Sequence, residues 1–240
     1  MGRIAIVTGG TRGIGKAISL MLRDAGYGVV AGYGSNDRAA REFSESTGIP
    51  AYRWNVGDHQ ECRDAVGTIE REFGPVDVLA NNAGITRDTC LHKMSRGDWQ
   101  DVIETNLGSC FNMSAAVFDG MRSRRFGRIV NVSSVNGQAG QFGQANYAAA
   151  KAGICGFTKA LAQEGAARGV TVNTIAPGYV DTDMVRTLSP EMLDKIVSRI
   201  PVGRLAEARE IARGVAFLVS DDAGFITGAT LSINGGQYMN

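Results

Sequence analysis

The sequence has few of the residues from which metal centres and disulfide scaffolds are built. Its 240 residues include only two histidines and four cysteines. The histidines have no partner at metal-ligand spacing and the cysteines form no Cys-x-x-Cys pair, so we expect no metal site. Reduced, mostly packed thiols in a cytoplasmic protein are the expected state of Cys62, Cys90, Cys110 and Cys155.

Excess charge and long apolar segments are missing as well. The 25 basic and 24 acidic residues leave a formal net charge of +1, so no nucleic acid or anionic membrane partner is expected. No apolar run reaches the ~18 residues that suggest a membrane-spanning helix. The N-terminus also lacks the apolar stretch and cleavage pattern of a signal peptide.

Glycine is abundant instead, at 32 of 240 residues, which is about twice its usual share. Short runs of Val and Ile alternate with segments of helical periodicity along the whole chain. Strands are expected at 3–8, 27–31, 51–56, 76–80, 128–133, 170–176 and 229–233, and helices at 14–25, 37–47, 58–73, 96–121, 145–167, 190–199 and 207–218. Because parallel strands need helical crossovers, this alternation predicts an α/β fold with a doubly wound parallel sheet and helices on both faces, in one domain over residues 1–240.

Ligands of such sheets bind beyond the carboxyl ends of the strands. Four segments are placed there: 9–15, 81–84, 133–134 and 177–182. In the first, Gly9, Gly13 and Gly15 would let the backbone approach a pyrophosphate at a helix N-terminus. A tight turn without a ligand is the alternative interpretation.

Tyr147 and Lys151 lie four residues apart, so on a helix they share one face. A free tyrosine has a pKa of about 10 and is about 0.1% ionised at pH 7. A neighbouring ammonium favours the phenolate, which allows proton exchange near neutrality. Taken alone, this spacing also occurs by chance on helix surfaces.

Five motifs in a fixed order make the chain similar to the short-chain dehydrogenase/reductase family. They are Thr8-Gly-Gly-Thr-Arg-Gly-Ile-Gly15, Asn81-Asn-Ala-Gly84, Asn131-Val-Ser-Ser134, Tyr147-Ala-Ala-Ala-Lys151 and Pro177-Gly-Tyr-Val-Asp-Thr182. The resemblance covers essentially the whole chain. It implies a Rossmann-type fold, a nicotinamide cofactor and the catalytic residues Asn106, Ser134, Tyr147 and Lys151.

The resemblance also implies a role for each catalytic residue. Tyr147 would donate a proton to a substrate carbonyl, and Ser134 would hydrogen-bond the same oxygen. Lys151 would make Tyr147 more acidic and hold the nicotinamide ribose. Asn106 would anchor a water-mediated proton relay, or alternatively kink its helix while satisfying backbone groups.

NADPH is the expected cofactor, because no acid stands at the tip of the second strand to bind the ribose 2′-hydroxyl of NAD. Arg12, Arg38 and Ser35 are available for a 2′-phosphate, although Asp37 lies close by. Arg38 would otherwise be a solvated charge at a helix start. The residues expected to bind the cofactor are Gly9, Thr11, Arg12, Gly13, Ile14, Gly15, Ser35, Arg38, Asn55, Val56, Asn82, Ala83, Gly84, Tyr147, Lys151, Pro177, Gly178, Val180 and Thr182.

The stretch 138–147 resembles the family members that reduce acetoacetyl-CoA to the R alcohol. An acyl-CoA substrate is therefore expected, with Phe142 and Tyr179 filling the volume that a long acyl chain would need. Phe142 packing at a subunit contact is the alternative. The residues expected to bind substrate are Asp88, Gln141, Phe142, Gln144 and Tyr179.

Other functions remain open from the sequence. A 3-oxoacyl-ACP reductase would be favoured by a basic docking patch, for which Arg122, Arg124 and Arg125 are candidates. A sugar or alcohol dehydrogenase and a non-enzymatic cofactor sensor are less favoured. The resemblance further implies a homotetramer that packs through the long helices, here segments 106–121 and 145–162, and through the last strand. Residues 187–204 are expected to act as a lid, because they follow the cofactor loop.

Overall fold

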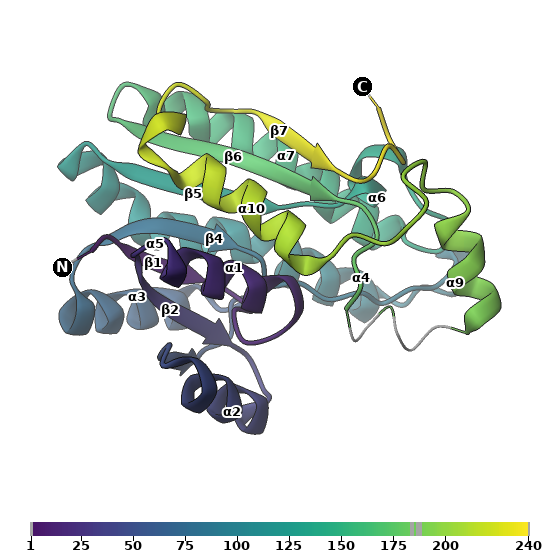
Figure 1. Ribbon diagram of the computed structural model, residues 1–240, viewed down its shortest axis with the longest axis horizontal. Coiled ribbons are helices and arrows are strands. Elements are labelled where there is room, and N and C mark those ends of the chain that lie inside the picture. Colours follow the sequence, from purple (N-terminus) through teal and green to yellow (C-terminus); the bar gives the residue numbers. More distant parts are fainter. Residues whose placement is uncertain (1, 183–184, 186–188, 240) are drawn as a thin grey trace.

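The computed structural model describes residues 2–182, 185 and 189–239. In this part of the chain seven strands form one sheet in the order β3-β2-β1-β4-β5-β6-β7, and every neighbouring pair is parallel (Figure 1). The strands are β1 (Ile4–Val7), β2 (Gly28–Tyr33), β3 (Ala51–Arg53), β4 (Val76–Asn81), β5 (Gly127–Val132), β6 (Val170–Pro177) and β7 (Thr230–Ile233). The chain order reverses between β1 and β4, so the predicted doubly wound, Rossmann-type sheet is confirmed.

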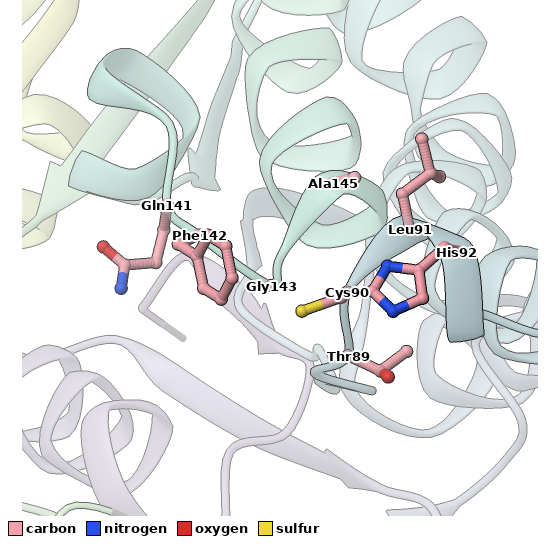
Figure 2. A pocket seen from close by; sticks show the side chains of 8 residues that line it. All are labelled: Thr89, Cys90, Leu91, His92, Gln141, Phe142, Gly143 and Ala145. Carbon is pink, nitrogen blue, oxygen red and sulfur yellow. The ribbon is translucent and has the colours of Figure 1, made fainter.

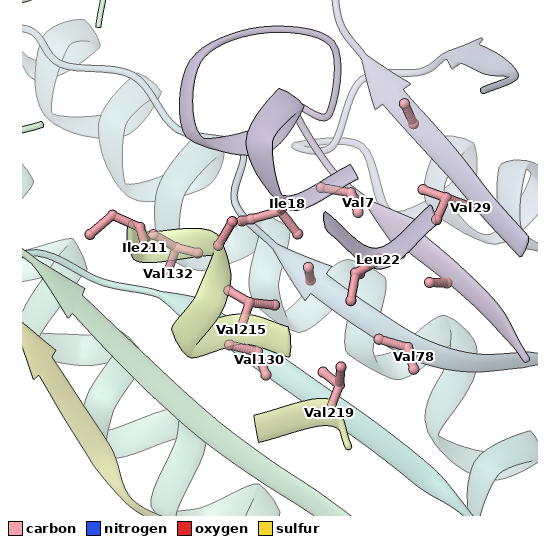
Figure 3. Packing of buried hydrophobic residues seen from close by; sticks show 14 of the residues in the cluster. Val7, Ile18, Leu22, Val29, Val78, Val130, Val132, Ile211, Val215 and Val219 are labelled. Atoms are coloured by element: carbon pink, nitrogen blue, oxygen red, sulfur yellow. The ribbon is translucent and has the colours of Figure 1, made fainter. Parts of the chain in front are cut away.

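Two apolar cores lie on the two faces of the sheet. Successive strand residues point to opposite faces, so Ala5 and Val7 of β1 enter one core and Ile4 and Ile6 enter the other. The first core is covered by α1 (Gly13–Asp24) and α10 (Ala208–Val219), as Figure 3 shows, with a contribution from α2 (Asp37–Thr47). The second is covered by α3 (His59–Phe73), α5 (Ser109–Arg124) and α7 (Ala145–Ala166).

Three shorter helices gather beyond the carboxyl ends of the strands: α4 (Arg96–Val102), α6 (Val135–Ala139) and α9 (Pro190–Val197) (Figure 1). Single 3₁₀ turns occur at Leu91–Lys93 and Asp221–Ala223. None of the helices in the described ranges is both long and apolar enough to cross a bilayer. The residues that the sequence assigns to the site therefore lie where loops and short helices cap the sheet.

The structure differs from the predicted elements at three places. The helix predicted over 96–121 is divided into α4, a π-helical turn at Ile103–Gly108, and α5. The strand predicted over 51–56 ends at Arg53, because Asn55 and Asp58 turn the chain into α3 through hydrogen bonds to the backbone N–H groups of Gly57 and Glu61. The five residues of α6 were not predicted.

Candidate cofactor and catalytic site

The loop between β1 and α1 is shaped by glycines that no other residue can replace without strain. Gly9 and Gly13 have φ angles of +61° and +52°. A Cβ on Gly15 would lie 2.0 Å from the carbonyl oxygen of Gly9. The N-cap residue, Arg12, makes no side-chain cap hydrogen bond to a described residue, and the first turn of α1 has no acidic side chain. The free N–H groups of this helix start therefore suit a phosphate.

A second loop, after β4, is locked onto the first. The hydroxyl oxygen of Thr8 accepts hydrogen bonds from the backbone N–H groups of Asn82 and Ala83, both at 3.0 Å. The Asn82 side chain donates to the carbonyl oxygens of Thr8 at 2.9 Å and Gly9 at 3.2 Å. These contacts join β1 and β4, the two strands at which the winding of the sheet reverses.

The loop after β6 reaches the same place. Gly178 packs so tightly on Asn234 that a Cβ would lie 2.8 Å from its Cα atom, and Val180 is buried beside Ala206. A Cβ on Gly13 would lie 3.6 Å from the Thr182 methyl group. The structure thus brings together the glycine-rich loop, Asn82–Ala83 and the segment that ends at Thr182, as the sequence predicts for the phosphate and nicotinamide ends of a dinucleotide.

Lys151 and Tyr147 both lie on α7 near the end of β5. The buried Lys151 ammonium donates a hydrogen bond to the carbonyl oxygen of Val132 at 2.7 Å, and its Nζ atom is 5.6 Å from the centre of the Tyr147 ring. The Ser133 hydroxyl donates to the Lys151 carbonyl oxygen at 2.7 Å. The lysine is therefore held by the backbone of β5, with its charge beside the tyrosine.

Ser134 and Ser133 have different tasks in the structure. Ser134 is the N-cap of α6, and its Oγ accepts the backbone N–H of Asn136 at 3.1 Å. The hydroxyl proton of Ser134 stays available for a further acceptor. The Ser133 hydroxyl instead donates its proton to the Lys151 carbonyl oxygen. This difference supports the choice of Ser134 as the residue that meets a substrate oxygen.

Asn106 lies in the π-helical turn and is fully buried. Its amide donates to the carbonyl oxygens of Ile85 at 2.9 Å and Val102 at 2.8 Å, while its Oδ1 has no hydrogen-bond partner among the described residues. A Cβ on Gly84 would lie 2.4 Å from this Oδ1 and 3.5 Å from Lys151 Nζ. An unpaired acceptor and an ammonium thus face the same glycine, which suits a hydrogen-bonded relay or a ribose hydroxyl.

The residues proposed to select the cofactor follow β1 and β2: Arg12 is the N-cap of α1, and Ser35 and Arg38 come after β2. The Arg38 side chain is 90% exposed and pairs with Glu42 at 2.8 Å, while Arg12 and Ser35 are exposed. Asp37 faces Arg53 at 3.5 Å. Sequence reasoning missed Arg53. The signal that could have found it is a basic residue at the end of β3, the strand that pairs with β2.

Asn55 and Val56 mainly organise the turn before α3. The Asn55 Oδ1 accepts the backbone N–H of Gly57 at 3.0 Å, and the Val56 carbonyl oxygen accepts the Asn112 amide at 3.0 Å. Thr11 is buried and Ile14 is partly buried at the start of α1. Pro177 ends β6.

A cavity of about 340 Å³ lies beside the start of α7. Figure 2 shows Gln141 and Phe142 on one side of it and the segment 89–92 on the other. Tyr179 lines a separate cavity of about 180 Å³, so the structure does not bring it to the cavity of Phe142. Gln144 donates to the Asp88 carboxylate at 2.7 Å. The sequence prediction missed residues 89–92, which carry no motif.

No group of three or more His, Cys, Asp or Glu side chains that could hold a metal ion occurs within the described ranges. Of residues 187–204, the predicted lid, Thr187 and Leu188 lie outside the described residues. The part that is described includes α9.

The glycine loops, the open start of α1 and the unpaired Asn106 acceptor together fit a dinucleotide. Residues 3–193 match the family model described as short chain dehydrogenase. The chain therefore belongs to the short-chain dehydrogenase family, whose members are oxidoreductases with a nicotinamide cofactor.

Full-length relatives narrow the comparison. The acetoacetyl-CoA reductase of Rhizobium meliloti (strain 1021) is 58% identical over 240 residues, and that of Shinella zoogloeoides is 59% identical over 240 residues; both matches cover 100% of each chain. The 3-oxoacyl-(acyl-carrier-protein) reductase of Salmonella typhimurium (strain LT2) is 49% identical over 240 residues, which is 99% of this chain and 98% of that protein.

Proposed function

We propose that this protein reduces acetoacetyl-CoA to (R)-3-hydroxybutyryl-CoA with NADPH. The observation that carries the proposal is the similarity, over the whole of both chains, to proteins named acetoacetyl-CoA reductase. The enzyme would be one domain over residues 1–240, would assemble as a homotetramer and would work in the cytoplasm, where its four free thiols stay reduced.

We assign the chemistry to the four residues Asn106, Ser134, Tyr147 and Lys151. The Tyr147 hydroxyl donates its proton to the 3-oxo oxygen, and the Lys151 ammonium, 5.6 Å from the ring centre, attracts the negative charge left on the ring oxygen. The Ser134 hydroxyl donates a hydrogen bond to the same oxygen and stabilises its developing negative charge. The nicotinamide cofactor, when bound, supplies the hydride.

A water-mediated relay anchored by Asn106 and Lys151 would return a proton from solvent to Tyr147 after turnover. The unpaired Asn106 Oδ1 accepts a hydrogen bond from a water molecule or ribose hydroxyl in the space opposite Gly84. The Lys151 ammonium faces the same space and donates into it. The buried position of both groups holds this relay in one geometry.

The cofactor would lie along the edge of the sheet from β2 to β6. The loop of Gly9, Gly13 and Gly15 would hold the pyrophosphate. Arg12 and Arg38 would pair with the 2′-phosphate, and Ser35 would donate to it. The remaining cofactor contacts are proposed for Thr11, Ile14, Asn55, Val56, Asn82, Ala83, Gly84, Tyr147, Lys151, Pro177, Gly178, Val180 and Thr182.

The acyl thioester would enter past the cavity that Gln141 and Phe142 line. Asp88 and Gln144, joined by a hydrogen bond, would contact its polar part. Phe142 would limit the acyl chain in this cavity, and Tyr179, which lines a separate cavity, is not assigned that role. Because the Phe142 side chain is 86% exposed, it could alternatively pack on a neighbouring subunit.

Comparison of two substrates tests this proposal. We expect kcat/KM for acetoacetyl-CoA to exceed that for a longer 3-oxoacyl-ACP by roughly tenfold or more, because the cavity beside Phe142 suits a short acyl chain. Loss of reduced nicotinamide absorbance measures both rates. A preference for the carrier-protein ester would overturn the assignment.

The second candidate is a 3-oxoacyl-ACP reductase, which the relative at 49% identity favours. An acidic carrier protein needs free cations, but the basic cluster contacts its own chain. Arg124 donates to the Val76 carbonyl oxygen at 2.6 Å, and Arg125 contacts the Ala167 carbonyl oxygen at 3.5 Å. Arg122 lies 5.7 Å from the centre of the Phe118 ring. Arg124 also lies 3.8 Å from the Asp77 carboxylate, which pairs part of the positive charge of the cluster.

Replacement of Tyr147 by Phe tests the proton donor. Since general acid catalysis contributes roughly 10²–10⁴-fold, we expect Tyr147→Phe to lower kcat by about 10³-fold. The dissociation constant of NADPH, measured by fluorescence, should change little, because the ring remains. Turnover at the wild-type rate would remove Tyr147 from the mechanism.

A further inference from the structure

A chain of side-chain hydrogen bonds joins three segments of the site. The Asn136 amide donates to Gln144 Oε1 at 2.9 Å, and the Gln144 amide donates to Asp88 Oδ2 at 2.7 Å. Asn136 lies in α6, Gln144 is the N-cap of α7, and Asp88 lies in the loop after β4. The chain thus links the helix that Ser134 begins to the helix that carries Tyr147.

The direction of this chain is set at one end by a carboxylate. A carboxylate only accepts hydrogen bonds, so the Gln144 atom next to Asp88 must be the nitrogen. The Gln144 oxygen then faces Asn136, which must present its own nitrogen. Asp88 therefore determines how both amides are turned.

Asn136 connects this chain to the catalytic hydroxyl. Its backbone N–H donates to Ser134 Oγ at 3.1 Å, while its side chain donates to Gln144. We propose that Asn136 is a positioning residue that, together with Asp88, holds the Gln144 amide with an N–H group directed toward the thioester carbonyl oxygen of the substrate. This inference rests on the proposed function, because it deepens the role of the same site.

The ligand class follows from the hydrogen-bond inventory. Among the described residues, Asp88 is the acceptor found for the Gln144 amide, so one N–H group remains for a ligand. Ser134 likewise retains its hydroxyl proton. Two donors that are both tied to Asn136 match a ligand with two acceptor oxygens on alternate carbons, which is the pattern of a 3-oxoacyl thioester.

Reversing the direction of the hydrogen bonds between Asn136, Gln144 and Asp88 tests whether Asn136 positions Gln144 for the substrate or only supports the fold. In Asp88→Asn, all three side chains are amides, so these hydrogen bonds can run in either direction and the original one is still available. Addition of Asn136→Asp places the carboxylate at the opposite end, and Gln144 must turn over to donate to it. The number of hydrogen bonds is the same in both variants, but the Gln144 oxygen now replaces its N–H group in the site.

We expect the double variant to have a kcat/KM for acetoacetyl-CoA about tenfold below that of Asp88→Asn, mainly through a higher KM. Its urea midpoint and its NADPH dissociation constant should match those of Asp88→Asn. Equal kcat/KM values for the two variants would overturn the inference, because a chain that only braces the fold works in either direction.

Asn136→Ala provides a second, uncharged test if the double variant folds poorly. Gln144 keeps its hydrogen bond to Asp88 in this variant but loses the Asn136 amide that holds its oxygen. We therefore expect a loss of roughly three- to tenfold in kcat/KM with unchanged NADPH binding. An unaltered kcat/KM would count against the role of Asn136. Wild-type protein that turns over only 3-oxoacyl-ACP would refute the proposed substrate, and the same variants would then be compared on that thioester.

Discussion

Asp37 is the acidic residue of the segment that follows β2, where an acid would bind the ribose of NAD. In the structure it faces Arg53, whose guanidinium also donates to the Gly34 carbonyl oxygen at 3.0 Å. Arg12 and Arg38 remain exposed at the same edge. A phosphate in this place would meet positive charge on several sides.

The double variant Arg12→Ala/Arg38→Ala should therefore lose its preference for NADPH. We expect its kcat/KM for NADPH to fall about 30-fold, because two charge-assisted hydrogen bonds to the phosphate disappear. The value for NADH should change little, and loss of the exposed Arg38–Glu42 pair should cost almost no stability. Steady-state kinetics with both cofactors measures the effect. Arg71→Ala, at the far end of α3, is the control. Equal losses with both cofactors would contradict the assignment.

The buried thiols should differ from the accessible ones in reactivity. Burial raises the pKa of the Cys62 thiol to about 12 and that of the Cys110 thiol to about 11, from an ordinary value of 9.0. Both stay protonated at pH 8, and only the thiolate is nucleophilic. Labelling at pH 8 followed by peptide mass spectrometry should find Cys90 and Cys155 modified before Cys62 and Cys110. Early labelling of Cys62 or Cys110 would contradict this.

The same shifts predict a pH dependence of stability. Both thiols hold their protons more tightly in the folded chain than in the unfolded chain. Their contribution is therefore complete below pH 9.0 and is lost as the pH rises toward the folded values of about 11 to 12.

At the scale of elements, buried polar side chains tie α7 to the sheet below the site. The Asn131 amide of β5 donates to the Thr158 hydroxyl of α7 at 2.8 Å, and the Thr174 hydroxyl of β6 donates to it at 2.8 Å. The Asn131 oxygen accepts the Asn81 amide of β4 at 2.8 Å. These side chains are buried, so their hydrogen bonds fix the helix that carries Tyr147 against three strands.

Thr158→Val should unfold more easily than the wild type. It keeps the side-chain shape but leaves two buried donors unpaired, which costs roughly 2–4 kcal/mol. Urea unfolding measures the free energy. Thr68→Val on α3, where the partner found for the hydroxyl among the described residues is the exposed Arg71, should change it by less than about 0.5 kcal/mol. Similar values for the two variants would show that Thr158 is not a structural anchor.

The elements that the sequence predicts well are those with strong local signals. α3 begins after the N-cap Asp58 and places Cys62, Val66 and Ile69 on one buried face, so periodicity and capping agree. The π-helical turn has no such signal. It depends on the Asn106 amide reaching the Ile85 carbonyl oxygen, which lies in a distant loop.

The candidate site likewise has parts that the sequence predicts and parts that it does not. Motifs predicted the glycine loop and the residues near Gly84, and the structure brings these together. Residues 89–92 form one wall of the cavity because the Thr89 N–H donates a hydrogen bond to the Gly143 carbonyl oxygen at 2.8 Å. No sequence motif predicts this contact. The place of Tyr179 depends on how its loop packs on Asn234 and Gly235, and this packing separates it from Phe142.

At the scale of the whole molecule, large apolar side chains remain on the outside. Phe111 on α5 is 54% exposed and Phe225 is fully exposed. Such residues are typical of subunit contacts. The proposed tetramer would bury the outer face of α5, the helix that follows Asn106.

Light scattering tests this assembly. Four chains of 25.4 kDa would give a particle of about 100 kDa, and Phe111→Asp should produce a smaller one because a charge cannot be buried unpaired. Phe217→Asp on α10 is the matched control, since Phe217 is 52% exposed but lies on the opposite layer. The tetramer proposal fails if wild-type protein elutes as a monomer, and the α5 contact fails if both variants behave alike.

The π-helical turn at Ile103–Gly108 also limits how this region can change in length. Such a turn holds one residue more than an α-helical turn does. Removal of that residue would leave an ordinary α-helical turn, and the wide turn that holds Asn106 opposite Gly84 would be lost. Deletions should therefore be tolerated far less here than substitutions of similar size.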